Sequence, residues 1–234
     1  MSRNDCDLKS CFLCRFCLPE WKDAILSKKT TLSFKKGKEI FREGERVKGI
    51  FFIYSGSVKV YTQWTGQKEL ILRFAKAGDI LGHRGIGAND IYPIGASAME
   101  DSRVCFIPND FLEATFKVDP SFTHRLMLFY AAELQKAEKR MRDLAHMEAK
   151  GRIALALLEI AEMYGRDKEK YIALPVNRQD IASYAGTTYE TIFKFFTVLI
   201  KANIISVSGK KIKINNPKRL QQFVTGKTTS RHRK

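Results

Sequence analysis

Glycine spacing is the feature that most constrains how this 234-residue chain folds. Ten of its 15 glycines lie between Gly37 and Gly95, where they separate short runs rich in β-branched and aromatic residues. Glycine tolerates the positive φ of tight turns, so the pattern predicts short antiparallel strands closed into a compact barrel or jelly roll. The strands are expected at Ile50–Tyr54, Val58–Tyr61, Leu70–Phe74 and Val104–Ile107.

A helical periodicity follows over about residues 122–149. Apolar side chains recur there at alternating spacings of three and four, with charged residues such as Glu133 and Lys136 beside them. A seam this narrow suits a partner helix, although an amphipathic helix lying on its own domain would show the same pattern. We therefore expect a parallel homodimer through Met127, Tyr130, Leu134, Ala137, Met141 and Leu144.

The last third of the chain predicts three helices and a hairpin. An apolar helix is expected over about residues 149–164, and a second over residues 177–185. Gly186 then permits a sharp turn into a third helix, which Thr187 or Thr188 caps. Helix, turn, helix and hairpin outline a winged helix-turn-helix, so the fold class is α+β. The hairpin strands are expected at Ile204–Val207 and Lys211–Ile214.

Positive charge is concentrated in the same third. From Lys150 onward there are 17 Lys and Arg against 6 Asp and Glu, a net of +11 out of +16 for the whole chain. Basic side chains near phosphates release condensed counterions, so this distribution favours a nucleic-acid partner. A basic tail at residues 227–234 on an otherwise ordinary protein is the alternative.

The predicted third helix carries the candidate base readers. Glu190 can accept a hydrogen bond from cytosine, and Lys194, one turn later on the same face, can donate to guanine. Each has a simpler explanation: Thr187 and Glu190 fit a capping box, Lys194 fits a solvated surface, and Phe193 fits the core. The complete set expected to contact DNA is Arg178, Thr187, Thr188, Tyr189, Glu190, Phe193 and Lys194.

These motifs resemble those of the CRP/FNR transcription regulators. The helix-turn-helix resemblance lies in Arg178–Ala182, Gly186 and Glu190–Ile192, and the remainder covers most of the chain from about Cys11 to Phe223. It implies a cyclic-nucleotide-binding-like β-roll, a long dimerisation helix, a palindromic DNA operator near promoters, and contact with RNA polymerase. The β-roll carries the rest of the pattern at Gly37, Glu43, Gly44, Ile53, Gly56, Val58, Gly78, Asp79 and Gly82.

The chain departs from the family pattern at four places in the helix-turn-helix and the β-roll. Lys194 stands where the family usually has arginine, and Phe193 is bulky for a position that is usually small. Lysine is a point donor without arginine's fork, so operator preference is expected to differ. Tyr92-Pro93 and His83 replace the arginine and glutamate that hold a cyclic nucleotide in other members, so cAMP is not expected to bind.

Four of the five cysteines fall within the first 17 residues, and the fifth is Cys105. Clustered cysteines in a reducing compartment favour metal or redox chemistry over structural disulfides. The spacing of Cys11, Cys14 and Cys17 resembles the N-terminal motif of FNR-type members, and the region of Cys105 resembles their remaining ligand. The resemblance implies a 4Fe–4S cluster that stabilises the dimer and is broken down by oxygen.

The sequence leaves other signals open. The cysteine spacing is tighter than in FNR-type members, so Cys6 could replace one ligand of the set. The same thiols could bind zinc, form a redox disulfide, or be incidental residues of a floppy N-terminus. Cys105 alone could be a buried strand residue. A small effector or a haem in the β-roll, with His83 as its ligand, is the further alternative.

The combined expectation is a cytosolic DNA-binding transcription regulator and not an enzyme. The sequence shows no nucleophile–base pair, phosphate loop, metal–carboxylate set, signal peptide or membrane span. Five regions are expected: a cysteine-rich segment over residues 1–20, the β-roll over 21–120, the dimerisation helix over 121–149, the winged helix-turn-helix over 150–226, and the basic tail over 227–234.

Overall fold

The computed structural model describes residues 11–64, 68–87, 89–174 and 176–226. It divides into two units, the first extending to Gln135 and the second beginning at Lys136. The predicted basic tail and Cys6 lie outside the described ranges. Within those ranges, no helix combines the length and apolar composition needed to cross a bilayer.

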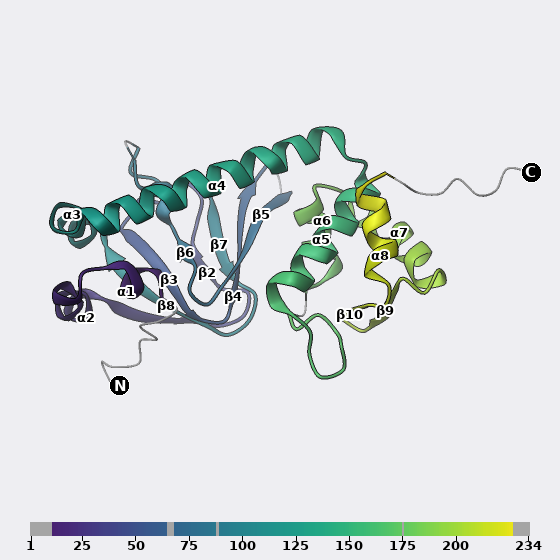
Figure 1. Ribbon diagram of the computed structural model, residues 1–234, viewed down its shortest axis with the longest axis horizontal. Helices are drawn as coiled ribbons and strands as arrows, with labels where there is room; N and C mark the ends of the chain where they lie inside the picture. Colours follow the sequence, from purple (N-terminus) through teal and green to yellow (C-terminus); the bar gives the residue numbers. More distant parts are fainter. Residues whose placement is uncertain (1–10, 65–67, 88, 175, 227–234) are drawn as a thin grey trace, which may run out of the picture. The chain divides into compact units, whose positions relative to one another are not determined.

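The first unit contains an antiparallel β-roll of two four-stranded sheets (Figure 1). The four predicted strands are all present, and four shorter strands complete the sheets. One sheet has the order β1-β8-β3-β6 and the other the order β2-β7-β4-β5. The strands are β1 Thr30–Phe34, β2 Glu39–Phe41, β3 Gly49–Ser55, β4 Ser57–Gln63, β5 Glu69–Lys76, β6 Ile80–Leu81, β7 Gly95–Ala98 and β8 Ser102–Pro108.

Strands β3 and β8 are buried on both faces, which explains why the sequence reads as continuous apolar runs there. In β3, Phe51 and Ile53 belong to the core between the two sheets, whereas Ile50 and Phe52 belong to a second cluster formed with the helices. Successive side chains of a strand point to opposite faces. Cys105 in β8 accordingly lies in the helix-side cluster.

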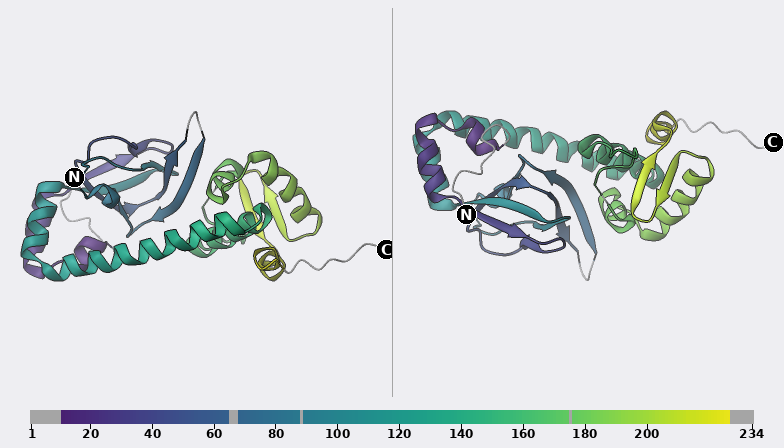
Figure 2. Two further views of the ribbon diagram at one scale, coloured as in Figure 1. Left: turned by 90° about the horizontal axis from the view of Figure 1, so that it is seen from above. Right: turned by 90° about the horizontal axis from the view of Figure 1, so that it is seen from below.

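Four helices contribute to that second cluster (Figure 2). They are α1 Phe12–Phe16, α2 Lys22–Lys28, α3 Asn109–Val118 and α4 Pro120–His146, with a 3-10 turn at Pro19–Trp21. The fully buried Asp119 joins the segment after α1 to α4. Its carboxylate accepts hydrogen bonds from the Leu18 amide at 2.7 Å and the Phe122 amide at 2.8 Å. The segment after α1 is thereby fixed to the first turn of α4.

Helix α4 confirms the predicted long helix. The residues of its predicted seam, however, fall into an exposed group and a partly buried group. Met127, Leu134 and Met141, spaced seven apart, are each more than half exposed. Tyr130 instead packs against its own unit, and its hydroxyl donates a hydrogen bond to the His83 carbonyl. The helix ends at His146 because the backbone at Glu148 is extended, with φ −61° and ψ 151°, before the next helix begins.

The second unit contains the predicted helices and hairpin (Figure 1). The elements are α5 Ala149–Tyr164, α6 Arg178–Ala185, α7 Tyr189–Lys201, β9 Ile205–Ser208, β10 Lys211–Ile214 and α8 Pro217–Val224. A short C-terminal helix that was not predicted from the sequence, α8, packs against α5. Its amphipathic face is only eight residues long, and Asn216 caps it through the Arg219 amide.

Replacing Asp119 tests the tie between the N-terminal segment and α4. We expect Asp119→Ala to lower the free energy of unfolding by about 2–4 kcal/mol, because it leaves two backbone amides without their acceptor. Urea denaturation followed by circular dichroism measures this change. Asp101→Ala is the control, since Asp101 forms an exposed ion pair with Lys35 and its loss should leave the free energy of unfolding nearly unchanged. Equal effects of the two substitutions would contradict the assignment.

Candidate DNA-binding surface and cysteine segment

The helix-turn-helix is built by one glycine and two N-caps. Asn177 caps α6, its side chain accepting from the Asp180 amide at 2.7 Å. Gly186 has φ 60° and ψ 48°, a left-handed conformation that other residues adopt at a cost. Thr188 then caps α7, its Oγ1 accepting from the Thr191 amide at 3.2 Å.

These caps correct one alternative from the sequence. A capping box of Thr187 and Glu190 does not form, because Thr188 is the cap and Thr187 precedes it. Glu190 lies in the first turn of α7, and its carboxylate pairs with Lys194. Its side chain therefore projects from the helix surface, where an incoming base could meet it.

The two helices are held together by six apolar residues on their inner faces. All six are buried in the structure. The relative position of α6 and α7 is therefore set by side-chain packing on both sides of the turn. They are Ile181, Ala182 and Ala185 on α6, and Ile192, Phe196 and Leu199 on α7.

The opposite face of α7 is exposed and mixed in chemistry. Thr188, Tyr189, Glu190, Phe193 and Lys194 are all exposed, and the core placement considered for Phe193 is wrong. Arg178 and Thr187 are partly buried. The structure thus brings the predicted contact residues to the N-terminal half of α7 and to the start of α6.

Glu190 and Lys194 form an ion pair within the exposed face. The Lys194 Nζ lies 2.6 Å from Glu190 Oε1, and both side chains are about three-quarters exposed. The hydrogen bond from Lys194 and its positive charge lower the pKa of Glu190 below its ordinary value. Glu190 is therefore a carboxylate at neutral pH, which acts as a hydrogen-bond acceptor only.

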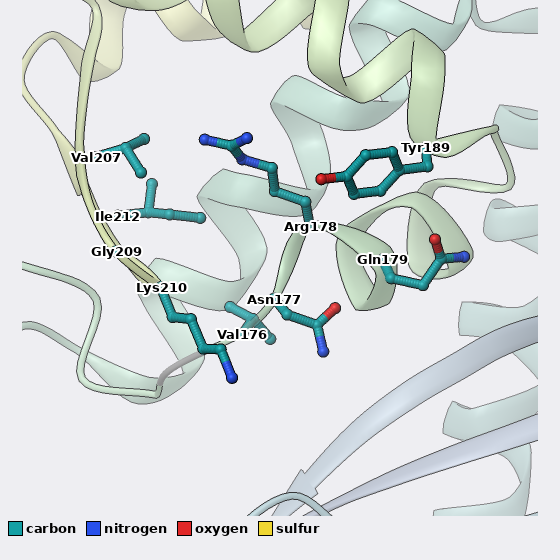
Figure 3. Close-up of a pocket in the computed structure, with 9 residues that line it drawn as sticks. All are labelled: Val176, Asn177, Arg178, Gln179, Tyr189, Val207, Gly209, Lys210 and Ile212. Atoms are coloured by element: carbon teal, nitrogen blue, oxygen red, sulfur yellow. The ribbon is translucent and has the colours of Figure 1, made fainter.

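A groove of about 390 Å³ lies between the start of α6, the start of α7 and the β9–β10 hairpin (Figure 3). Arg178 extends across it, and the Tyr189 ring points toward the Arg178 side chain. Lys210 at the hairpin turn lines the other side. Lys210 is not among the contact residues predicted from the sequence, although a lysine next to Gly209 in a hairpin turn is a recognisable signal. Two cationic groups in one groove provide charge and donors for a phosphate.

Arg152 on α5 binds the backbone of the turn between α6 and α7. Its guanidinium donates to the carbonyls of Ala185 at 2.8 Å and Gly186 at 3.1 Å, and also to that of Met147 at 2.5 Å. One side chain therefore joins the end of α6 to the connection between α4 and α5. No sequence pattern identifies this role, because every acceptor is a backbone carbonyl.

The N-terminal cysteines lie on a helix packed into the core. Cys11 and Cys17 flank α1, Cys14 lies within it, and all three are buried in the cluster that also contains Cys105. The alternative of incidental cysteines in a floppy N-terminus does not hold for these three. Their helix is fixed by Phe12, which contacts the rings of Phe122 and Phe129 of α4 at 5.9 and 5.6 Å between centroids.

The cysteines satisfy only part of what a metal site requires. Four thiols within one buried cluster have the donor chemistry of an iron–sulfur site. Among the residues that the structure describes, however, no three His, Cys, Asp or Glu side chains are grouped closely enough to hold a metal ion. The structure therefore gathers Cys11, Cys14, Cys17 and Cys105 in one region without arranging them as ligands.

The side chain of His83, the candidate haem ligand of the β-roll, is buried. Only 2% of it is exposed, and it packs edge-on against Phe129. Burial, together with the charges of Arg73 and Arg84, lowers the pKa of His83 to about 3. Both arginines lie 3.7–3.8 Å from buried Glu133 of α4. The imidazole is therefore neutral at physiological pH.

Comparison with known proteins decides the family. Residues 31–119 match the cyclic nucleotide-binding domain, and residues 151–223 match the Crp-like helix-turn-helix domain. The chain is 30% identical over 225 residues to the fumarate and nitrate reduction regulatory protein of Yersinia pestis, covering 92% of this chain and 89% of that one. The chain belongs to the CRP/FNR family. It is a DNA-binding transcription regulator.

Two further relatives of this CRP/FNR regulator agree. Electron transport regulator A of Shewanella oneidensis is 32% identical over 192 residues, covering 81% of this chain and 76% of that one. The structure of FixK2 from Bradyrhizobium japonicum is 28% identical, with a TM-score of 0.73, and the match covers 83% of this chain and 96% of that one. The predicted fold class, a β-roll followed by a long helix and a winged helix-turn-helix, is confirmed.

Replacing Arg152 tests how the turn of this CRP/FNR regulator is held. Arg152→Met keeps the aliphatic stem but removes the donor of the Met147, Ala185 and Gly186 carbonyls and of a longer bond to Leu144. We therefore expect a loss of about 2–3 kcal/mol in the free energy of unfolding. Urea denaturation measures it. The control Arg142→Met removes an exposed arginine paired with Asp143 and should cost less than about 0.5 kcal/mol. A wild-type midpoint for Arg152→Met would contradict the role.

Proposed function

We propose that this regulator binds a palindromic operator near promoters as a homodimer, in the cytosol and in contact with RNA polymerase. The observation that carries the DNA-binding part is the exposed N-terminal half of α7, flanked by the cationic groove. In a helix-turn-helix, the second helix enters the major groove with its N-terminal residues toward the bases. Glu190 and Lys194 would then contact base edges, and Arg178 and Lys210 the phosphates.

The ion pair between Glu190 and Lys194 suits this task. In free protein the two groups satisfy each other across one helical turn at 2.6 Å. An exposed pair of this kind contributes little to stability, so exchanging it for base contacts costs little. The carboxylate would accept from cytosine, and the ammonium group would donate to guanine or to a phosphate.

The exposed apolar positions of α4 support the dimer. Met127, Leu134 and Met141 are 57%, 60% and 61% exposed, although large apolar side chains at heptad spacing lose free energy by facing water. A second copy of α4 would cover them. Ala137 and Leu144 of the predicted seam are partly buried within one chain, so they are expected at the border of the interface.

Substitution in the middle of this seam tests the dimer. Leu134→Glu places a charge in each facing helix without disturbing the core of one chain, so dimerisation should weaken by about 100-fold or more. Sedimentation velocity on anaerobically purified protein measures the shift to monomer. Gln135→Glu adds the same charge at the neighbouring exposed position and should remain dimeric. Two variants that sediment alike as dimers would contradict this interface.

Redox control is proposed to reside in Cys11, Cys14, Cys17 and Cys105. Support comes from their placement in the cluster where α1 packs on α4. Phe12, adjacent to Cys11, contacts Phe122 and Phe129, so a chemical change at the cysteines would alter the packing of the dimerisation helix. A 4Fe–4S cluster, when bound, would supply sensitivity to oxygen. A thiol switch in the same residues is the alternative.

Anaerobic purification distinguishes the two forms of redox control. If the four thiols hold a cluster, the anaerobic protein should be brown, contain about four iron and four sulfide per chain, and bleach in air. Cys14→Ser should abolish the colour. Cys6→Ser is the comparison, and it should keep the colour when the ligands are the proposed four. A colourless anaerobic protein without iron or sulfide would contradict the cluster and leave the thiol switch.

A further inference from the structure

We propose that Phe193 recognises the C5-methyl group of a thymine in each operator half-site. The inference rests on the proposed insertion of α7 into the major groove. It assigns a base preference to a side chain that is neither a hydrogen-bond donor nor an acceptor. It also predicts that affinity depends on a single methyl group of the DNA.

Exposure separates Phe193 from the other phenylalanines of the same helix. Its side chain is 53% exposed, whereas Phe195 and Phe196 are 2% and 1% exposed in the core. The core behind α7 is therefore filled without Phe193. More than half of the Phe193 side chain faces water and is therefore available to a partner.

The neighbours of Phe193 place it beside the base readers. It follows Glu190 by three residues and Tyr189 by four, so it lies next to both on the helix surface. Tyr189 points into the groove beside the hairpin, as Figure 3 shows. Phe193 therefore lies on the hairpin side of the Glu190–Lys194 pair, within the half of α7 that would face base edges.

Only one group on the major-groove edges of the bases is chemically suited to contact the Phe193 ring. Among the four bases, only thymine presents an apolar group, its C5-methyl, in the major groove. A ring that covers a hydrogen-bonding edge without replacing its bonds would instead lose affinity. Phe193 should therefore favour a thymine next to the base pair that Glu190 and Lys194 contact.

Val198 provides a matched control on the same helix. It is also apolar and 51% exposed, but it lies five residues later and on the other flank of the exposed face. If exposed apolar surface contributed to DNA binding in a general way, substitution of either residue would have the same effect. Recognition of one methyl group would involve Phe193 alone.

The experiment removes the methyl group and nothing else. Full-length protein selects its operator from random duplexes, and each thymine of a half-site is then replaced in turn by 2′-deoxyuridine. Fluorescence anisotropy gives the Kd of the wild type, Phe193→Ala and Val198→Ala. We expect one position at which the wild type and Val198→Ala each lose about fourfold in affinity, the equivalent of one buried methyl-sized group. Phe193→Ala should show no loss there.

The results that would contradict the methyl contact differ from the result that would contradict operator binding. A selected half-site without thymine, a wild type insensitive to every uracil, or a Phe193→Ala variant that keeps the sensitivity would overturn the methyl contact. Each of these would leave the proposed operator binding intact. Failure to enrich any sequence would instead contradict the proposed function, and the role of Phe193 with it.

Discussion

The hydrogen bonds of the Arg152 guanidinium are the contacts on which the geometry of the helix-turn-helix depends most. The guanidinium binds the carbonyls of Ala185 and Gly186, which the end of α6 and the left-handed glycine leave without helical partners. It also binds the carbonyl of Met147, in the connection that follows α4. Arg152 thus holds the end of α6 and the turn without using the exposed face of α7, which remains available for bases.

A comparable constraint organises the first unit, which extends to Gln135. Strands β3 and β8 are buried on both faces, so alternate residues serve two clusters, one between the sheets and one under the helices. This alternation places Cys105 with the α1 cysteines, although 88 residues separate it from Cys17. The contacts of Phe12 with α4 then connect the chemistry of these cysteines with the helix proposed to form the dimer.

The sequence predicted what local periodicity and turn chemistry determine. It placed four of the eight strands described for the roll, the long helix, the helices of the DNA-binding unit before its last one, and the sharp turn at Gly186. It could not choose between Thr187 and Thr188 as the cap, because the two have the same side chain and differ only in backbone conformation.

Long-range contacts account for what the sequence missed. Tyr130 fits the a/d spacing of α4, but the carbonyl of His83 binds its hydroxyl and turns it inward. His83 itself is buried by rings that come from another element. Arg152 and Asp119 act on backbone atoms, which carry no residue-specific signal.

The most direct test of the account is the base preference of a Glu190→Ala variant. Affinities for operators carrying each of the four base pairs at every half-site position would be measured for the wild type and the variant. If α7 reads bases through this carboxylate, discrimination should fall by about 1–3 kcal/mol at one base pair and remain elsewhere. An unchanged preference at every position would contradict the proposal that this face of α7 reads the operator.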